Sequence, residues 1–203
     1  MIKLVLLRHG QTTYNKESRF TGWTDVPLTN RGIMEAKKAG KILKEKGFTF
    51  DVVFTSILKR AIDTTNILLN EMGLNHIPIH QSWRLNERHY GALQGLNKAE
   101  MAAKYGEDRV LKWRRSYQIR PPALNKKDKR WSGNDSKYKD MDKKYIPLTE
   151  SLKDTVKRVV PYWNKEIKPA LKKEKKVLVS ASGNSLRALV KYLDNMPSDE
   201  ILS

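Results

Sequence analysis

The sequence predicts an α/β fold in which a mainly parallel sheet is flanked by helices on both faces. Three short apolar runs, at 2–7, 51–55 and 176–181, have the length of buried strands, and patterns of helical period lie between them. Strands that alternate with helices in this way are typical of βαβ units, whose strands run parallel. We therefore expect one domain over residues 1–203.

The helices have separate signals in the sequence. A helix at 31–46 is expected because Thr29 and Asn30 are favoured cap residues, apolar residues recur on one face, and Gly47 can end the helix. The other helices are expected, from apolar residues at helical spacing, at 58–72, 97–105, 107–117, 151–173 and 184–193.

Prolines and loop residues mark the irregular parts of the chain. The segment 76–80 is predicted as an edge strand, because Pro78 cannot donate a hydrogen bond to a neighbouring strand. Pro161 and Pro169 are expected to kink or divide the last long helical region. Residues 119–147 are rich in Pro, Gly, Asn, Asp and Lys and show no period. A loop of this length is usually a functional lid or a mobile segment.

The composition is strongly basic and free of cysteine. The 203 residues include 40 Lys and Arg against 22 Asp and Glu, and the resulting net charge of +18 favours anionic partners. The lack of cysteine excludes disulfides, zinc–thiolate sites and cysteine nucleophiles. The sequence shows no secretory signal, no apolar run that could span a membrane, and no nucleic-acid-binding motif. We expect a cytoplasmic protein that binds neither membrane nor nucleic acid.

Two of the predicted strands end in sequences suited to an anion. The first leads into Arg-His-Gly at 8–10, and the last leads into Ser-Gly-Asn at 182–184. In a parallel sheet both turns lie at the carboxyl edge, where ligands of α/β proteins bind. Glycine permits close approach of the backbone, and a helix N-terminus offers free N–H groups. We expect an anionic ligand between these turns, against the His9 imidazole and the Arg8 guanidinium.

Other chemistries lack support in the sequence. His76, His80 and His89 have no comparable frame and, from the residues alone, are expected to be structural. A metal site is not expected, because there is no HExxH pattern and no close cluster of His, Asp and Glu. The lack of a Walker A pattern argues against nucleotide-driven transfer.

Longer motifs add a resemblance to a known family. Arg8-His9-Gly10 resembles the signature of the histidine phosphatase superfamily. Further runs, in order along nearly the whole chain, are similar to 2,3-bisphosphoglycerate-dependent phosphoglycerate mutases; they lie at 20–25, 83–98, 105–107, 113–117 and 183–187. The run at 83–98 is the one most specific to the mutase branch.

The resemblance implies a role for each matching residue. His9 would carry the phosphoryl group as phosphohistidine, Glu87 would donate and accept the proton, and Ser182 stands at a further catalytic position. Neighbouring cations would disfavour the imidazolium and keep His9 nucleophilic. The residues implied to bind the phosphate and carboxylate groups of the substrate are Arg8, Asn15, Thr21, Gly22, Arg60, Arg88, His89, Tyr90, Lys98, Arg114, Arg115, Gly183 and Asn184.

The implied reaction interconverts 3-phosphoglycerate and 2-phosphoglycerate in glycolysis and gluconeogenesis. It would be primed by 2,3-bisphosphoglycerate, would need no metal, and would take place in a homodimer. Two alternatives stay open. One is a histidine-type phosphatase with a broader range of substrates, and the other is a catalytically weak member of the family that only binds anions.

The chain departs from the family pattern in two places. The family has a histidine where this chain has Ser182, and the loss of one preorganised donor typically costs about 10²–10³ in rate. We therefore expect a site that binds phosphate but turns over slowly, and that Ser182→His accelerates. The sequence also ends at Ser203, where family members continue with a segment that helps to close the site. A wetter pocket would favour water as the phosphoryl acceptor.

Overall fold

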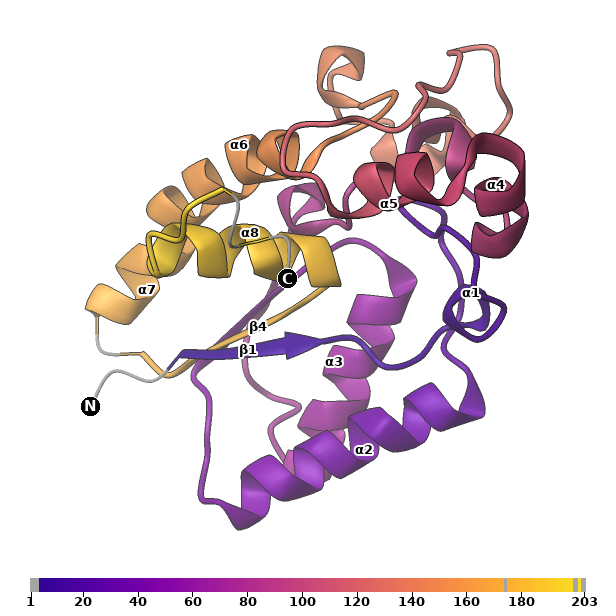
Figure 1. Ribbon diagram of the computed structural model, residues 1–203. Helices are drawn as coiled ribbons and strands as arrows, with labels where there is room; N and C mark the ends of the chain where they lie inside the picture. The colour runs from indigo at the N-terminus through magenta and orange to yellow at the C-terminus, as the bar shows by residue number, and fades with distance from the viewer. Residues whose placement is uncertain (1–3, 174, 199–200, 202–203) are drawn as a thin grey trace.

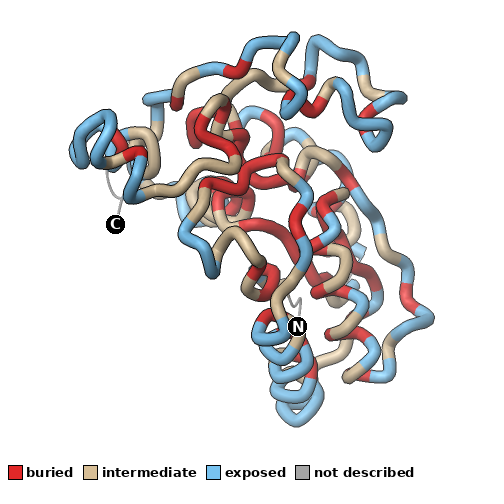
Figure 2. Tube along the Cα trace, turned by 90° about the vertical axis from the view of Figure 1, so that its right-hand side faces the viewer, coloured by how far each residue is buried: buried red, intermediate tan, exposed pale blue. Residues whose placement is uncertain are grey.

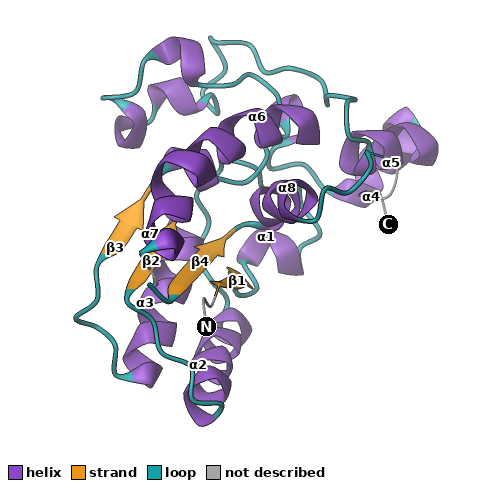
Figure 3. Ribbon diagram, turned by 90° about the vertical axis from the view of Figure 1, so that its left-hand side faces the viewer, coloured by secondary structure: helices purple, strands orange, loops and turns teal. Residues whose placement is uncertain are grey.

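A parallel sheet lies at the centre of the fold (Figures 1 and 3). The computed structural model describes residues 4–173, 175–198 and 201. In these ranges the sheet has four strands, in the order β1-β4-β2-β3, and all neighbouring strands pair in parallel. The strands are β1 (Leu4–Arg8), β2 (Val52–Thr55), β3 (Ile79–Gln81) and β4 (Val177–Ala181). The predicted fold class is confirmed; residues 2 and 3 of the first predicted strand lie outside the described residues.

One face of the sheet is covered by α2 (Asn30–Glu45) and α3 (Lys59–Met72). Val53 of β2 and Leu178 of β4 point to this face and join a buried apolar cluster with Leu68 of α3. The outward side of α2 is largely exposed, whereas the buried residues gather along the sheet (Figure 2).

The opposite face is covered by α6 (Leu152–Tyr162) and α8 (Gly183–Leu193). Val52 and Val177, each adjacent in sequence to a residue that faces α3, point to this side and pack with Val159 of α6. Side chains of a strand alternate between the two faces, so a continuous apolar strand is buried on both sides. The prediction of helices on both faces is therefore confirmed.

Shorter helices lie beyond the carboxyl ends of β1 and β4 (Figure 1). They are α1 (Thr13–Lys16), α4 (Lys98–Tyr105) and α5 (Glu107–Arg115). The predicted helices at 97–105 and 107–117 are thus found within two residues of their expected bounds. This group supplies Asn15, Lys98, Arg114 and Arg115 to the cavities at this end of the sheet.

Two proline-containing regions differ in detail from expectation. The edge strand predicted at 76–80 is found as β3, which begins three residues later and ends one residue later; Pro78, just before it, contributes only its carbonyl, which accepts from the Val53 N–H at 3.0 Å. The helical region predicted at 151–173 is divided as expected, but by a π-helical turn at Trp163–Ile167 that follows Pro161 and precedes α7 (Lys168–Lys172).

The segment 119–147 is packed against the body of the protein. It is irregular, as predicted, apart from three single 3-10 turns at Ser132–Asn134, Ser136–Tyr138 and Lys143–Tyr145. Trp131, Tyr138 and Ile146 are buried in a cluster with Trp23, and the Tyr138 ring stacks on Trp23 at a centroid distance of 5.1 Å. The segment is therefore anchored rather than loosely attached.

None of the helices in the described ranges is both long and apolar enough to cross a membrane.

Candidate active site

The two turns singled out in the sequence lie side by side at the carboxyl edge of the sheet. β1 and β4 are neighbours, with Arg8 in register with Ala181. The His9 N–H continues the ladder by donating to the Ala181 carbonyl at 3.1 Å. Directly after β4, Gly183 begins α8, so the N-terminus of that helix faces the turn that carries His9. The predicted juxtaposition of these turns is confirmed.

The His9 ring is held in one neutral tautomer. Its Nδ1 lies 2.8 Å from the Gly10 carbonyl, which can only accept, so Nδ1 carries the hydrogen and Nε2 keeps its lone pair. Arg60 Nε lies 3.3 Å from that Nε2 and donates to it. The pKa of His9 is lowered to about 3, chiefly by burial and then by the charge of Arg60, with a smaller contribution from Arg8. The expectation that neighbouring cations keep His9 uncharged is supported in direction, but burial, which the sequence did not indicate, is the larger cause.

Arg60 ties the nucleophile to the loop at 20–25. It projects from α3, is only 1% exposed, and donates from Nη1 to the Thr24 carbonyl at 2.9 Å and from Nη2 to the Gly22 carbonyl at 2.7 Å. Gly22 has a positive φ of 57°, and a Cβ there would collide with the Gln94 side chain. This position therefore requires glycine, and the resulting turn aims its carbonyl at Arg60. Burial lowers the pKa of Arg60.

Two adjoining cavities open beside these turns. One, of about 260 Å³, is lined by Arg8, His9, Gln11, Asn15, Glu35 and Lys98. The other, of about 300 Å³, shares Arg8, Asn15 and Lys98 with the first. The remaining residues that line the larger cavity are Arg19, Phe20, Thr21, Gly22, Glu87, Tyr90, Arg114, Arg115, Gly183, Asn184 and Arg187. A ligand that spans both cavities would meet His9 at one end and the α5 arginines at the other.

Positive charge is crowded around the larger cavity. Burial lowers the pKa of Lys98, and the charges of Arg114, Arg8 and Arg115 lower it further. Burial likewise lowers the pKa of Arg187, with Arg115 and Arg88 as the next causes. Because these cations repel one another, an anion that entered the cavity would relieve the repulsion. The site is therefore electrostatically suited to a ligand with more than one negative charge.

Glu87 brings a carboxylate into this cationic cavity. Its Oε1 accepts from the backbone N–H of Arg88 at 2.7 Å and of Asn184 at 3.2 Å. Within the described residues Glu87 Oε2 accepts no hydrogen bond. This oxygen lies close to Gly183, since a Cβ added to that glycine would be 3.8 Å from it. Beside it, the Asn184 amide donates to the Tyr90 hydroxyl at 3.3 Å. One carboxylate oxygen is thus fixed, and the other is placed where a proton can be exchanged.

Ser182 contributes no hydrogen bond to the site. It is fully buried and forms the N-cap of α8 without a side-chain cap, and its Oγ has no partner among the residues that the structure describes. The side chain does not line either cavity. This agrees with the sequence argument that serine does not replace a cationic donor at this position.

Three residues from the predicted binding set line neither cavity, namely Arg60, Arg88 and His89. Arg60 instead contacts His9 and the loop at 20–25. Arg88 is fully buried, donates to the Arg114 carbonyl at 2.8 Å, and stacks over the Tyr90 ring at 4.5 Å. His89 is also fully buried, and its Nδ1 accepts from the Gly91 N–H at 3.0 Å. Burial lowers the pKa of His89 to about 3. Arg88 and His89 therefore support the fold around the site. For His89 this agrees with the expectation from the residues alone.

The sequence analysis did not select several residues that line the cavities, namely Gln11, Arg19, Phe20, Glu35 and Arg187. A signal existed for Arg187, since it lies four residues after Gly183 on the same face of one helix. No local signal marked Arg19, which reaches the site because residues 19 and 97 form an isolated antiparallel bridge. Among the described residues, no group of three or more His, Asp or Glu could hold a metal ion.

Comparison with known proteins places these features in a family. A family model described as the histidine phosphatase superfamily, branch 1, matches residues 4–203. A mycobacterial glucosyl-3-phosphoglycerate phosphatase, described as its complex with VO3, superposes with a TM-score of 0.74 and 26% identity, over 99% of this chain and 84% of that one.

Two other solved structures are similar at lower identity. YhfR of Bacillus stearothermophilus gives a TM-score of 0.72 and 25% identity over 98% of this chain and 83% of that chain. A phosphoglycerate mutase of Bacillus anthracis gives a TM-score of 0.66 and 22% identity over 96% of this chain and 81% of that chain. This likeness concerns the fold alone.

Proposed function

Because the chain belongs to branch 1 of the histidine phosphatase superfamily, we propose that it transfers phosphoryl groups through His9 from small phosphorylated acids. The observation that carries this proposal is the neutral His9 ring, whose Nε2 lone pair is beside Arg60 at the edge of a cationic cavity. Phosphoryl transfer needs a nucleophile, exact positioning and positive charge around the equatorial oxygens, and this site offers all three without a metal.

The first step would form the phosphohistidine. His9 Nε2 attacks phosphorus, the bond from phosphorus to the substrate oxygen breaks, and Glu87 gives its proton to the leaving oxygen. Arg8 and Lys98 lie where they can bind the phosphoryl oxygens, since both line the cavity that contains His9. A protonated Glu87 is required at the start, and it leaves the step as a carboxylate.

The second step would transfer the phosphoryl group from His9 to an acceptor. When water is the acceptor, Glu87 takes a proton from the water, the water oxygen bonds to phosphorus, and the bond to Nε2 breaks to release inorganic phosphate. The similarity to a phosphatase at 26% identity supports this outcome. Hydrolysis is therefore the outcome that we propose first.

The substrate is proposed to carry a second anionic group. Arg114 and Arg115 line the larger cavity, together with Arg187, on the side away from His9. Guanidinium groups bind carboxylate and phosphate through paired hydrogen bonds. A phosphorylated three-carbon acid has a phosphate and a carboxylate within one small molecule, and this class fits the charges of the site.

A mutase activity is the second candidate, and a specific observation favours it. The run at 83–98 resembles the phosphoglycerate mutase branch, and it supplies Glu87, Tyr90 and Lys98 to the cavity. In that case the acceptor would be a hydroxyl of the same three-carbon acid rather than water. The phosphohistidine would be formed first from 2,3-bisphosphoglycerate.

The two candidates differ in their products. The purified chain is incubated with 3-phosphoglycerate, with and without 2,3-bisphosphoglycerate, and products are followed by phosphorus NMR. Inorganic phosphate as the main product supports the phosphatase, whereas 2-phosphoglycerate that appears only with the primer supports the mutase. His9→Ala is the control and should yield neither. Equal product from the parent and from His9→Ala would contradict the proposed function.

A further inference from the structure

A buried ion pair lies behind the segment that carries Glu87. Arg158 of α6 and Glu150, just before that helix, are 9% and 4% exposed. Arg158 Nε donates to Glu150 Oε1 at 2.7 Å, and Nη2 donates to Oε2 at 2.9 Å, so the pair is bidentate. Neither residue lines the cavities that contain the proposed catalytic groups. Any effect of the pair on the site is therefore transmitted through the residues that it contacts.

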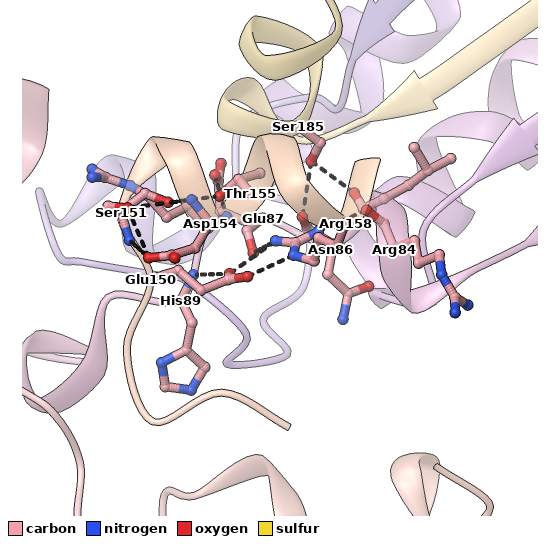
Figure 4. Close-up of polar contacts among 12 residues, drawn as sticks. Arg84, Asn86, Glu87, His89, Glu150, Ser151, Asp154, Thr155, Arg158 and Ser185 are labelled. Carbon is pink, nitrogen blue, oxygen red and sulfur yellow. Dashed lines mark hydrogen bonds and ion pairs between the residues drawn. The ribbon is translucent and has the colours of Figure 1, made fainter. Parts of the chain in front are cut away.

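Arg158 holds two carbonyls of the segment 84–89 (Figure 4). Its Nη1 donates to the Arg84 carbonyl at 2.7 Å, and its Nη2 donates to the carbonyl of Glu87 itself at 2.9 Å. The guanidinium is planar and rigid, so these bonds fix the two peptide groups relative to each other. The backbone of Glu87 is thus set by a side chain from α6.

Glu150 holds the other end of the same segment. Its Oε2 accepts from the His89 N–H at 2.8 Å, and its own N–H donates to the His89 carbonyl at 2.8 Å. From α8, Ser185 Oγ reaches the Leu85 carbonyl at 2.8 Å and the Asn86 carbonyl at 2.9 Å. The segment 84–89 is irregular apart from a single 3-10 turn, so these side chains replace the ladder that a strand or helix would have supplied.

Stability alone does not account for this arrangement. Two charges taken out of water lose much of their hydration, and apolar residues of similar volume often stabilise a core as well or better. The pair does provide a fixed set of donors and acceptors at backbone groups for which the described residues offer no other partner. Its geometry therefore points to positioning rather than to a gain in stability.

We propose that Arg158 and Glu150 are positioning residues that hold the Glu87 carboxylate in its proton-transfer geometry. This inference rests on the proposed function, in which Glu87 protonates the leaving oxygen. Of the two backbone N–H groups that donate to Glu87 Oε1, that of Arg88 belongs to the segment and that of Asn184 belongs to α8, so a shift of the segment relative to α8 pulls the carboxylate away from one of its two donors. A misplacement of about 1 Å in a catalytic group can cost about 10²-fold in rate.

The test replaces the pair as a unit. Arg158→Met with Glu150→Leu removes both charges and keeps comparable volume, and Arg158→Lys keeps the charge but loses the planar fork. For the double variant we expect kcat on 3-phosphoglycerate to fall about 10²-fold, with KM within about twofold because the binding arginines are untouched. Arg158→Lys should recover part of the lost kcat. In a crystal structure of the double variant, the Glu87 carboxylate should be displaced by about 1 Å or more.

The control is an exposed ion pair of the same kind. Lys59 and Asp63 on α3 lie 2.8 Å apart at the surface, and Lys59→Gln with Asp63→Asn should change neither kcat nor the place of Glu87. Glu87 unmoved in the double variant would overturn the positioning role, and so would a displaced Glu87 with unchanged kcat. A parent without turnover would contradict the proposed function, while the place of Glu87 in the two crystal structures would still decide the positioning role.

Discussion

At the scale of single residues, the chemistry depends on how His9 is kept neutral. Its Nδ1 hydrogen is bound to the Gly10 carbonyl, its Nε2 is beside Arg60, and its pKa is about 3. An imidazole in this state is unprotonated at Nε2 at all physiological pH values, and phosphorus would take the place of the Arg60 N–H that its lone pair now accepts. The sequence pointed to His9 through its place after a predicted buried strand, although β1 is only partly buried, and the resemblance implied Arg60 as a binding residue but not its hydrogen bond to His9 Nε2.

The lowered pKa of His9 makes a prediction about stability. Between the folded value of about 3 and the ordinary value of 6.5, the unfolded chain binds the proton and the folded chain does not. Stability should therefore fall as the pH drops below 6.5, by about 1.4 kcal/mol per pH unit for this group. Urea unfolding of the parent and of His9→Gln, each at pH 7 and pH 5, measures this loss of stability.

The parent should lose more stability than His9→Gln over that interval, by about 2 kcal/mol, since about 1.5 pH units of the window are crossed. His89 contributes a similar loss to both proteins, because burial lowers its pKa to about 3 as well, so it cancels in the comparison. An equal loss in parent and variant would contradict the neutral, buried state of His9.

Ser182 provides a second test at the same scale. Its hydroxyl is buried and finds no partner in the described part of the chain, and the residue is the N-cap of α8, next to Gly183, which lines the larger cavity. Ser182→His should raise kcat by about 10²–10³-fold, because a cationic donor would then face the transferring phosphoryl group. Steady-state kinetics checks this.

Ser182→Gln is the matched comparison for Ser182→His. It adds similar bulk without a charge, so a gain confined to the histidine variant assigns the effect to the imidazole. If Ser182→His folds as the parent does and kcat does not rise, the expectation that Ser182 slows turnover is contradicted.

At the scale of elements, periodic segments could be predicted and packing partners could not. The helices α2 and α3 were expected within about one residue of their bounds, because cap residues and glycines mark their ends. The segment 119–147 has no period, so nothing in it indicated that Trp131 and Tyr138 are buried against Trp23. The same limit applies to the pair of Arg158 with Glu150, because the backbone groups that their side chains bind lie 61 to 74 residues earlier in the chain.

The anchoring of that segment can be tested through one hydrogen bond. The Asn86 amide donates to the Tyr138 hydroxyl at 3.0 Å in a buried setting, next to Glu87. Tyr138→Phe leaves this donor unpaired and should lower the free energy of unfolding by about 1–3 kcal/mol. Chemical denaturation measures the loss. Tyr145→Phe, at a ring that is 54% exposed, should stay within about 0.5 kcal/mol of the parent. Similar values for the two variants would contradict the anchoring.

At the scale of the whole molecule, part of the positive charge is concentrated around the larger cavity. Lys98 and Arg187 have pKa values lowered by burial and by neighbouring cations, so the cavity carries repulsion that an anion can relieve. The sequence showed the excess of Lys and Arg but not this concentration, because residues from α4, α5 and α8 meet only in the fold.

Anions should therefore stabilise the protein. At a concentration of about 100 times its Kd, phosphate should add about 2.7 kcal/mol to the free energy of unfolding. For a chain of this size that corresponds to a rise in Tm of about 5–10 °C. Thermal unfolding with phosphate, against chloride at equal ionic strength, measures the effect. Arg115→Gln should show a smaller rise, and equal Tm values in the two salts would contradict an anion site.

The most direct measurement concerns the covalent state of His9. The parent is incubated with 2,3-bisphosphoglycerate or 3-phosphoglycerate, quenched, and analysed by mass spectrometry of its peptides. We predict one phosphoryl group on the peptide that contains His9, labile in acid and stable in base, and absent from His9→Ala. An unlabelled parent, or a label that resists acid or persists in His9→Ala, would contradict phosphoryl transfer through this imidazole.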